Sequence, residues 1–197
     1  MRWLLRIAGA VAAVVAVIVI ALALAGNREG AGKKSATVEI NRPAAQVFRH
    51  ITQDKFVKRW VGGLVEMTPV SEAGLRVRDR LTVAFDDGGR RTEMQVIITA
   101  IEPNRRLTFT VNSWGAPSAS FREKCEYVLT KTNGYTRLSF SGEMEYFGPL
   151  TRLLEPLKTF AAQKKLETDL ARLKEQVEAE PPTGVPTRDA TAAAPQH

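Results

Sequence analysis

Few side chains in this sequence could exchange protons or act as nucleophiles. The chain has two histidines, His50 and His197, and one cysteine, Cys125. Acid–base and nucleophilic catalysis needs such groups held beside a partner. His50 lies on a short predicted helix, on a different face from Val47 and Ile51, and we interpret it as a surface residue. His197 lies in a polar tail, and Cys125 fits a strand as a small buried apolar residue. The sequence therefore predicts no catalytic residue.

Two carboxylates close in sequence, Glu143 and Glu145, are the remaining candidates for an acid–base pair. A spacing of two residues puts both on one face of a strand, and we interpret that face as solvated. The sequence contains no phosphate-binding glycine loop and no metal-ligand cluster. A single cysteine can form neither an internal disulfide nor a thiolate metal site. We therefore expect no metal and no cofactor, and a binding protein is favoured over an enzyme.

The charge of the chain is strongly basic but scattered. There are 28 Lys and Arg against 21 Asp and Glu, which gives a net charge of +7. The paired cations Arg90-Arg91, Arg105-Arg106 and Lys164-Lys165 lie at predicted strand ends or on the outer face of a helix. No basic stretch is interleaved with aromatic residues, as a base-stacking platform requires. The sequence therefore predicts no nucleic-acid partner.

The N-terminal segment is typical of a membrane span. Ile7 to Ala25 contains no charged or strongly polar residue, and at about 1.5 Å per residue it spans roughly the hydrocarbon core of a bilayer. Trp3 lies at the interfacial position, between Arg2 and Arg6. We predict a single-pass anchor over residues 1–25. A cleaved signal peptide is the alternative, because Ala23-Leu24-Ala25 resembles a cleavage site.

The rest of the chain divides into three predicted parts. Residues 26–35 are small and polar and are predicted to form a flexible linker. Residues 36–180 form the domain, and residues 181–197 are rich in Pro, Ala and Thr and are predicted to be disordered. The flanking charges do not decide the orientation in the cell membrane. The short N-terminal tail favours a domain facing the periplasm or exterior, with the cytoplasmic face as the alternative.

The sequence of the domain predicts one antiparallel sheet, with helices near both ends of the domain. Ala36 to Ile40 is a strand, and two short helices follow, the second begun by Asp54 and stopped by Gly62-Gly63. Turn signals at Asp87-Gly88-Gly89 and Asn133-Gly134 favour a meander of hairpins. The six runs that alternate like strands are Leu64 to Val70, Leu75 to Phe85, Thr92 to Ile101, Leu107 to Ser113, Phe121 to Thr130 and Tyr135 to Tyr146.

A long amphipathic helix is predicted from Leu150 to about Glu180. Its apolar stripe follows three- and four-residue spacing through Leu150, Leu153, Leu157, Phe160, Leu166, Leu170, Leu173 and Val177. Pro156 lies inside this pattern and is predicted to kink the helix about two turns in. One apolar face of the sheet and this stripe need each other as partners. The predicted fold class is therefore α+β: a curved antiparallel sheet of about six to seven strands wrapped on a long C-terminal helix, plus an N-terminal transmembrane helix.

Several segments carry a resemblance to a known superfamily. Val38 to Phe48 resembles the opening strand and helix of the SRPBCC superfamily, and Phe56 to Trp60, Ile101 to Leu107 and Gly134 to Leu138 resemble later parts of it. The resemblance covers about Thr37 to Glu178. This superfamily includes START lipid-transfer domains, polyketide cyclases and coenzyme Q-binding proteins. The resemblance implies the helix-grip fold, with a hydrophobic pocket between sheet and helix for a lipid, an isoprenoid or a polycyclic molecule.

The predicted ligand-binding residues are aromatic or lie on the apolar face of the sheet and helix. A pocket lined by such side chains is how a folded domain holds an apolar ligand. Trp114, in a loop, is expected to gate the pocket mouth or to cover the rim of the core. The full set is Trp60, Val83, Phe85, Met94, Val96, Phe109, Val111, Trp114, Tyr127, Phe140, Met144, Leu157 and Phe160.

These features support one main hypothesis and two alternatives. The main hypothesis is a membrane-anchored domain that binds or transfers a hydrophobic small molecule, such as a lipid, isoprenoid or quinone-like compound. The first alternative is a cyclase- or aromatase-like enzyme acting on a hydrophobic substrate. The second is a protein-interaction domain whose groove receives an apolar segment of another protein.

Overall fold

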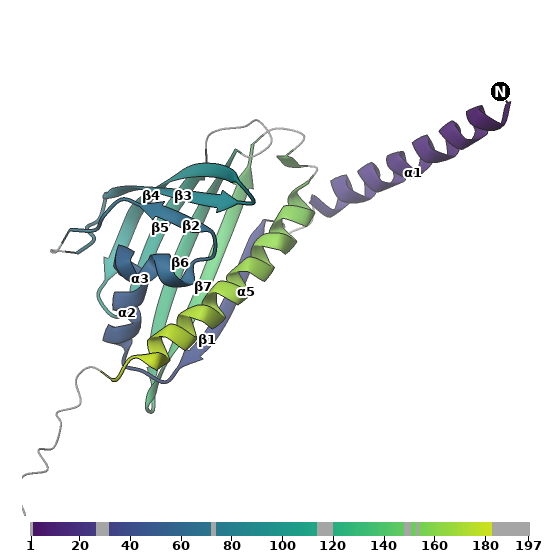
Figure 1. Ribbon diagram of the computed structural model, residues 1–197. Helices are drawn as coiled ribbons and strands as arrows, with labels where there is room; N and C mark the ends of the chain where they lie inside the picture. The colour runs from purple at the N-terminus through teal and green to yellow at the C-terminus, as the bar shows by residue number, and fades with distance from the viewer. Residues whose placement is uncertain are drawn as a thin grey trace, which may run out of the picture.

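The computed structural model describes residues 2–26, 32–71, 74–113, 120–147, 151–152 and 154–182. Its helices are α1 (Arg2–Gly26), α2 (Ala44–Thr52), α3 (Asp54–Trp60) and α5 (Glu155–Ala179). Its strands are β1 (Lys33–Ile40), β2 (Leu64–Met67), β3 (Arg80–Asp87), β4 (Arg90–Glu102), β5 (Arg106–Ser113), β6 (Phe121–Thr132) and β7 (Tyr135–Tyr146). Figure 1 shows these elements along the chain.

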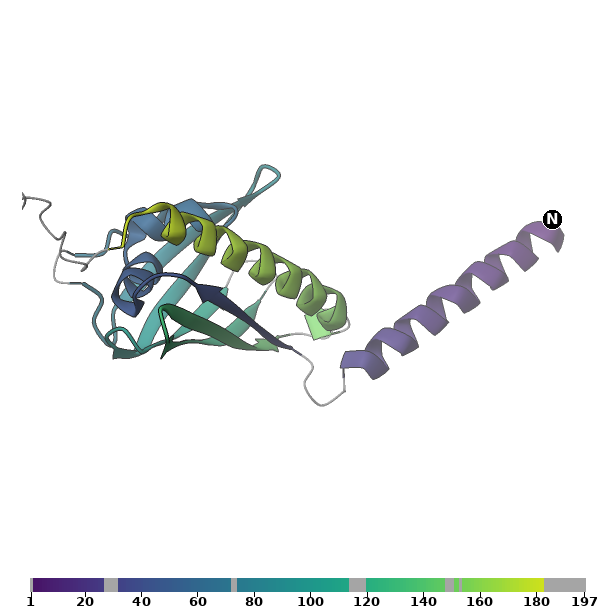
Figure 2. The same ribbon diagram turned by 90° about the horizontal axis from the view of Figure 1, so that it is seen from below.

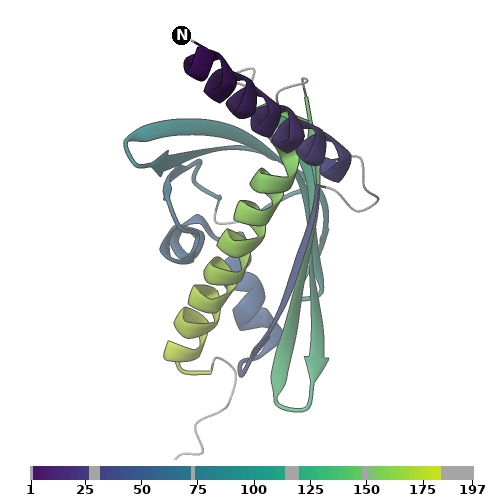
Figure 3. The same cartoon turned by 90° about the vertical axis from the view of Figure 1, so that its right-hand side faces the viewer.

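The seven strands form one sheet in the order β1-β7-β6-β5-β4-β3-β2. Every pairing is antiparallel. β2 to β7 form a meander, and its last strand, β7, pairs with β1, which forms one edge of the sheet. The sheet curves around α5 (Figure 3). The end of α5 lies near α2 and α3, which close that end of the domain (Figure 1). The predicted curved antiparallel sheet around a long C-terminal helix is confirmed.

The hairpin connections follow the predicted turn signals. Asp87 and Arg90 pair directly, and the two residues between them, Gly88 and Gly89, have φ angles of 61° and 87°. Positive φ at both central positions is what a two-residue turn of this twist requires, and glycine adopts it without a steric penalty. The signal at Asn133-Gly134 likewise connects β6 to β7.

Several predicted strand boundaries differ from the structure, and β2, for example, ends at Met67 instead of Val70. β1 begins at Lys33 because Lys33, Lys34 and Ser35 pair with β7, so three residues of the predicted linker belong to the sheet. Backbone pairing needs no apolar alternation, and the polar start of this strand concealed it. β3 begins at Arg80 instead of Leu75. The segment before it turns at Arg78, which has a φ of 76°, and leaves Val77 exposed.

The predicted kink at Pro156 is wrong. α5 begins at Glu155, so Pro156 lies in its first turn. Proline is tolerated there because the missing N–H would have no partner within the helix. The amphipathic pattern before Glu155 therefore belongs to a separate segment. Of that segment only residues 151–152 and 154 are described, and Leu150 and Leu153 lie outside the described residues.

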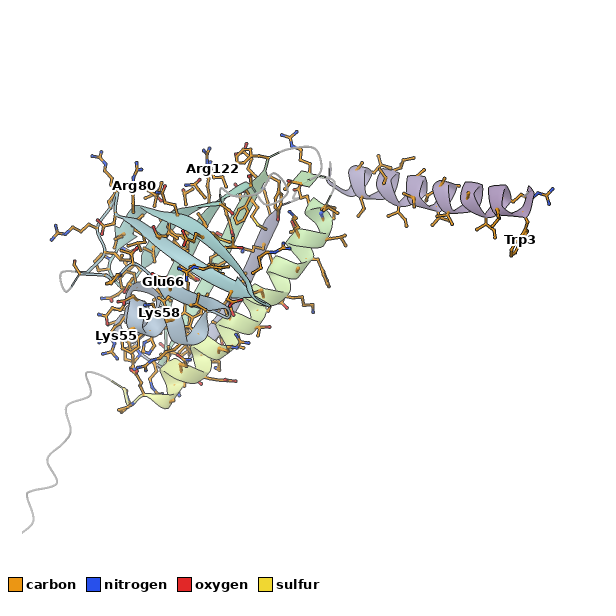
Figure 4. All side chains as sticks on the ribbon, turned by 45° about the horizontal axis from the view of Figure 1, so that its top comes forward. Trp3, Lys55, Lys58, Glu66, Arg80 and Arg122 are labelled. Carbon is orange, nitrogen blue, oxygen red and sulfur yellow. The ribbon has the colours of Figure 1, made fainter. Side chains whose placement is uncertain are left out.

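The N-terminal helix contains one span, Arg6–Leu24, that is long and apolar enough to cross a membrane. α1 projects away from the sheet near the start of α5 (Figures 1 and 2). Trp3 lies near its far end (Figure 4) and is 72% exposed. Half of the predicted linker, 27–31, and most of the predicted disordered tail, 183–197, lie outside the described residues.

The C-terminal end of α5 is held by the turn after β1. Arg42 donates hydrogen bonds from its guanidinium to the carbonyl oxygens of Glu178 and Glu180. The backbone N–H of Asn41 donates to Glu178 Oε1 at 2.7 Å. The last carbonyls of a helix lack partners within the helix, and a cation there also interacts favourably with the helix dipole. These contacts anchor α5 against the start of α2.

Stability in acid is expected to depend on Glu178. The hydrogen bond from the Asn41 N–H lowers the pKa of this carboxyl below its ordinary value of 4.5. A group whose pKa falls on folding stabilises the fold fully above its unfolded pKa, and the contribution is lost as the pH falls through the folded value. Glu178→Gln should therefore lower the free energy of unfolding at pH 7 and flatten its decline below about pH 5.

This expectation is checked by urea unfolding across that pH range. The matched control is Glu175→Gln, because Glu175 lies on the same helix and is exposed. A Glu178→Gln profile that overlays the control profile would contradict the assigned role.

Candidate functional site

One face of the sheet carries most of the predicted ligand-binding residues. In register, Val83 faces Met94, Val96 faces Val111, and Tyr127 faces Phe140. Directly opposed residues share a sheet face, and alternate residues of a strand return to it. The core cluster on this inner face includes Val83, Tyr127 and Phe140 together with buried residues of α5. The inner face is therefore the face that the helix covers.

The inner face is covered unevenly. The residues on β6 and β7 are buried, among them Cys125, Tyr127, Leu138 and Phe140. α5 lies along β1, at that side of the sheet, and against α2 and α3. Several apolar residues on β3, β4 and β5 are only partly buried, among them Phe85, Met94, Val96, Phe109 and Val111. We call these five residues the inner-face strip. They form an apolar surface that the fold leaves accessible in part.

Aromatic contacts join the strip to the buried core. The rings of Phe109 and Tyr127 are stacked with centroids 5.9 Å apart. Tyr127 in turn meets Phe140 edge-on at 4.9 Å. Lys165 of α5 places its ammonium 5.5 Å from the ring centroid of Phe85. The strip therefore packs against the buried rings of Tyr127 and Phe140 on one side, and the side chain of Lys165 lies beside it at Phe85.

Leu157 and Phe160 do not join the site. Both were predicted to lie on the buried stripe of the helix, and the structure leaves them 57% and 65% exposed. Leu166, Leu170, Leu173 and Val177 are the buried residues of that stripe. The prediction is wrong for the first turns of α5, because the stripe counted from Leu150 assumed one continuous helix.

The two tryptophans and Met144 occupy different places. Trp60 is buried in α3, where its Nε1–H donates to the carbonyl oxygen of His50 at 3.0 Å. Met144 is partly buried on the inner face of β7, and the Tyr146 hydroxyl lies 3.3 Å from its sulfur. Trp114 lies outside the described residues. Trp60 therefore packs beside the short helices instead of along the strip.

A buried ion pair interrupts the apolar inner face. Lys34 Nζ on β1 lies 3.0 Å from Glu123 Oε1 on β6, with side chains 15% and 7% exposed. Sequence analysis did not single out either residue. The signal was present for Glu123, because its spacing from Cys125 and Tyr127 places it on the same inner face. For Lys34 there was none, because the residue was assigned to the linker.

Burial keeps the thiol and the phenols of the inner face protonated. Loss of hydration raises the pKa of the Cys125 thiol, and the charge of Glu123 raises it further. Burial likewise raises the pKa of Tyr127 far above its usual value and that of Tyr146 to about 12. A protonated thiol is a poor nucleophile, whereas protonated phenols can donate hydrogen bonds. The face is suited to holding a molecule more than to attacking one.

His50 is a core residue, contrary to its interpretation as a surface residue. It is 1% exposed. Its Nδ1 lies 2.9 Å from the carbonyl oxygen of Gln46, and its Nε2 lies 3.4 Å from Glu180 Oε1. The helical spacing was read correctly, but Phe56 of α3 covers the face that we took for surface, with ring centroids 4.3 Å apart. His50 connects α2, α3 and the end of α5.

Two surface hollows lie at the edges of the sheet, and neither contains a predicted site residue. One, of about 440 Å³, is lined by residues 68–71, by Leu75 and Arg76, and by the start of β3. The other, of about 380 Å³, lies between the end of β1, the β6–β7 turn and Lys174. Among the described residues no group of three or more His, Cys, Asp or Glu side chains is placed to hold a metal ion.

Comparison with solved structures identifies the fold. A conserved protein from Geobacillus kaustophilus superposes with a TM-score of 0.63 at 14% identity, over 75% of this chain and 95% of that one. A protein from Chromobacterium violaceum gives 0.60 at 14% identity, over 76% and 99%. Ara h 8.0201 gives 0.59 at 13% identity, over 75% and 98%. At these identities the likeness establishes the helix-grip fold alone.

Comparison of sequences identifies the family. No curated protein sequence matches the chain. The family model described as polyketide cyclase / dehydrase and lipid transport matches residues 32–178, which contain the whole sheet and nearly all of α5. The predicted resemblance to this superfamily is confirmed. The chain belongs to the polyketide cyclase / dehydrase and lipid transport family.

Proposed function

We propose that this protein is a membrane-anchored domain that binds or transfers a hydrophobic small molecule, such as a lipid, an isoprenoid or a quinone-like compound, along the inner-face strip. The observation that carries the proposal is the strip itself. Five apolar side chains on three adjacent strands are only partly buried, although they adjoin a well-packed core. Covering apolar surface releases about 25 cal/mol per Å². An apolar ligand lying on the strip would gain this energy.

The N-terminal helix supports a role at a membrane. A domain tethered to the bilayer meets lipid-soluble molecules at a high effective concentration. α1 leaves the domain near the start of α5, so one end of the sheet lies next to the anchor (Figures 1 and 2). In this proposal the domain is on the periplasmic or exterior side, and protease added outside intact cells would digest it there.

The protonated state of the inner-face thiol and phenols favours binding over catalysis. A cyclase-like enzyme would use a group that changes its protonation or attacks the substrate. On the inner face, burial instead raises the pKa of Cys125, Tyr127 and Tyr146 away from neutrality. Hydrogen-bond donation by the phenols remains available for orienting a bound molecule.

The test is to recover the ligand from the protein after expression at its own membrane. A protease site inserted between Gly26 and Gly32 allows the domain to be released from the purified full chain. Native mass spectrometry and organic extraction then identify what the released domain holds. We expect the released domain to hold one hydrophobic molecule in stoichiometric amount. The same domain with Phe109→Asp, released in the same way, should contain no bound molecule. A domain that is empty, and that also fails to take up lipids or quinones offered to it, would contradict the proposal.

A further inference from the structure

The first turns of α5 leave apolar side chains in solvent. Among the described residues outside α1, the large apolar side chains that are mostly exposed are Val65, Val77, Leu157 and Phe160. Leu157 and Phe160 are the most exposed of them, at 57% and 65%, and lie three residues apart on one helix. Ala161 and Lys164 are exposed on the same side of the helix, because a spacing of three, four or seven residues keeps side chains on one face. We call Leu157, Phe160, Ala161 and Lys164 the exposed α5 face.

The covalent chain holds this face close to the end of the apolar span. α1 ends at Gly26, and the structure describes the chain again from Gly32. A chain of that length reaches at most about 20 Å. Gly32 lies beside the start of α5, since a Cβ on it would be 3.0 Å from Glu155 Oε1. α1 also contacts α5, near the start of that helix (Figures 2 and 3). A bilayer crossed by α1 therefore has its surface next to the first turns of α5.

The charges along this part of α5 are positive. Residues 156–166 contain three lysines and no acidic residue. Positive charge near a helix N-terminus opposes the helix dipole, so helix stability does not account for it. The Lys164 ammonium lies 5.8 Å from the ring centroid of Phe160, so its stem follows the apolar surface. Anionic lipid headgroups have the charge that complements these lysines.

From these observations we propose that the exposed α5 face docks on the surface of the bilayer that α1 crosses, with Leu157 and Phe160 inserted at the boundary between headgroups and acyl chains. Lys164 then lies at the level of the lipid phosphates. This inference rests on the membrane anchor of the proposed function and adds a second membrane contact to it. Apolar side chains beside lysines on one helix are typical of helices that lie in this boundary.

Docking at two points would fix the orientation of the domain. The next residue of α5, Lys165, lies 5.5 Å from the ring centroid of Phe85 in the inner-face strip. The helix that touches the bilayer is therefore also the helix that borders the strip. In this orientation the strip stays close to a source of apolar molecules.

The test uses the full chain in vesicles of phosphatidylcholine and phosphatidylglycerol. Ala161→Cys provides a site for an NBD fluorophore, and the native Cys125 stays unlabelled because it is only 3% exposed. The quencher is a phosphatidylcholine with a nitroxide near the start of one acyl chain. Glu175→Cys is the matched control, since Glu175 is exposed on nearly the same face but lies about 21 Å further along the helix. We expect the nitroxide lipid to quench the label at position 161 about fivefold more strongly than the label at position 175.

Variants of the chain labelled at position 161 locate the contact. Leu157→Ser with Phe160→Ser should reduce the quenching to that of the control position, and exposed positions tolerate such changes. Val65→Ser with Val77→Ser is the matched control, because these side chains are 53% and 51% exposed but lie on β2 and before β3. Its quenching should stay unchanged. Lys164→Glu keeps both apolar side chains and should weaken the quenching about twofold, because the anionic headgroups repel the new carboxylate.

Each outcome separates this inference from the proposed function. Equal quenching at positions 161 and 175 would overturn the docking and leave the anchor and the apolar ligand in place. Quenching that survives loss of both Leu157 and Phe160 would also overturn it. A label at position 161 that is shielded from water but not quenched by the nitroxide lipid would show that a second copy of the chain covers the face instead. A chain that separates from the vesicles during flotation at alkaline pH would contradict the anchor, and with it the proposed function.

Discussion

Replacing Phe109 with Asp is expected to weaken the binding of an apolar probe by about 100-fold. Phe109 lies on β5, the strand of the inner-face strip that borders the buried core on β6, and its ring stacks on Tyr127 with centroids 5.9 Å apart. A carboxylate here would have to lose its hydration when an apolar molecule covers it, with no cation recorded beside it among the described residues. The measurement is a fluorescence titration of the released domain with N-phenyl-1-naphthylamine.

Phe160→Asp is the matched control for this variant. Phe160 is also a phenylalanine of the domain, but it is 65% exposed on the first turns of α5. Its replacement should leave the affinity within about twofold, because the side chain is already in water. Phe109→Leu should retain most of the affinity, and thermal melting of all three variants checks that they are folded. Similar affinities for Phe109→Asp and Phe160→Asp would show that the ligand does not lie on the strip.

Replacing Leu173 with Ala is expected to lower the free energy of unfolding by about 2–5 kcal/mol. Leu173 is fully buried in the core cluster between α5 and the sheet. Truncation removes its buried methyl groups and leaves a cavity that the rigid surroundings fill only in part. Urea unfolding of the released domain measures the loss, which is large for a fold of this size.

The control for Leu173 is another leucine of the same helix. Leu157 is 57% exposed, so Leu157→Ala should change the free energy of unfolding by no more than about 0.5 kcal/mol. Comparing the stability losses of Leu173→Ala and Leu157→Ala shows whether the amphipathic stripe stabilises the domain along the whole helix or only from Leu166 onward. Equal losses for the two variants would mean that the first turns of α5 are packed against something in solution.

The sequence alone was enough to predict the sheet, its hairpins and the helix that it wraps. Alternation along each strand is a local property, and it placed Val83, Val96, Val111 and Tyr127 on one face, as the register shows. Turn residues such as Gly88 and Gly89 act within four residues of chain. The apolar N-terminal span is a matter of composition and length, and the structure has a helix there.

The tertiary structure decided where partly exposed apolar surface remains and which polar groups are buried. Leu157 and Phe160 fit the helical stripe as well as Leu166 does, but only the path of the chain before Glu155 determines whether the sheet reaches them. His50 is buried because Phe56 of the next helix covers it. Neither the exposure of Leu157 and Phe160 nor the burial of His50 can be predicted from the spacing of apolar residues along the sequence.

The Lys34–Glu123 pair shows the physical reason most clearly. Its two residues are far apart in sequence and meet only because β1 returns to the edge beside β7. Local patterns record which face a side chain takes, since that depends on the 2.0 and 3.6 periods of strand and helix. They do not record which distant side chain lies opposite, since that depends on strand order and register. The fold of this protein was therefore largely determined within short windows of sequence, whereas the pairing of its buried charges was determined by the position of β1 beside β7.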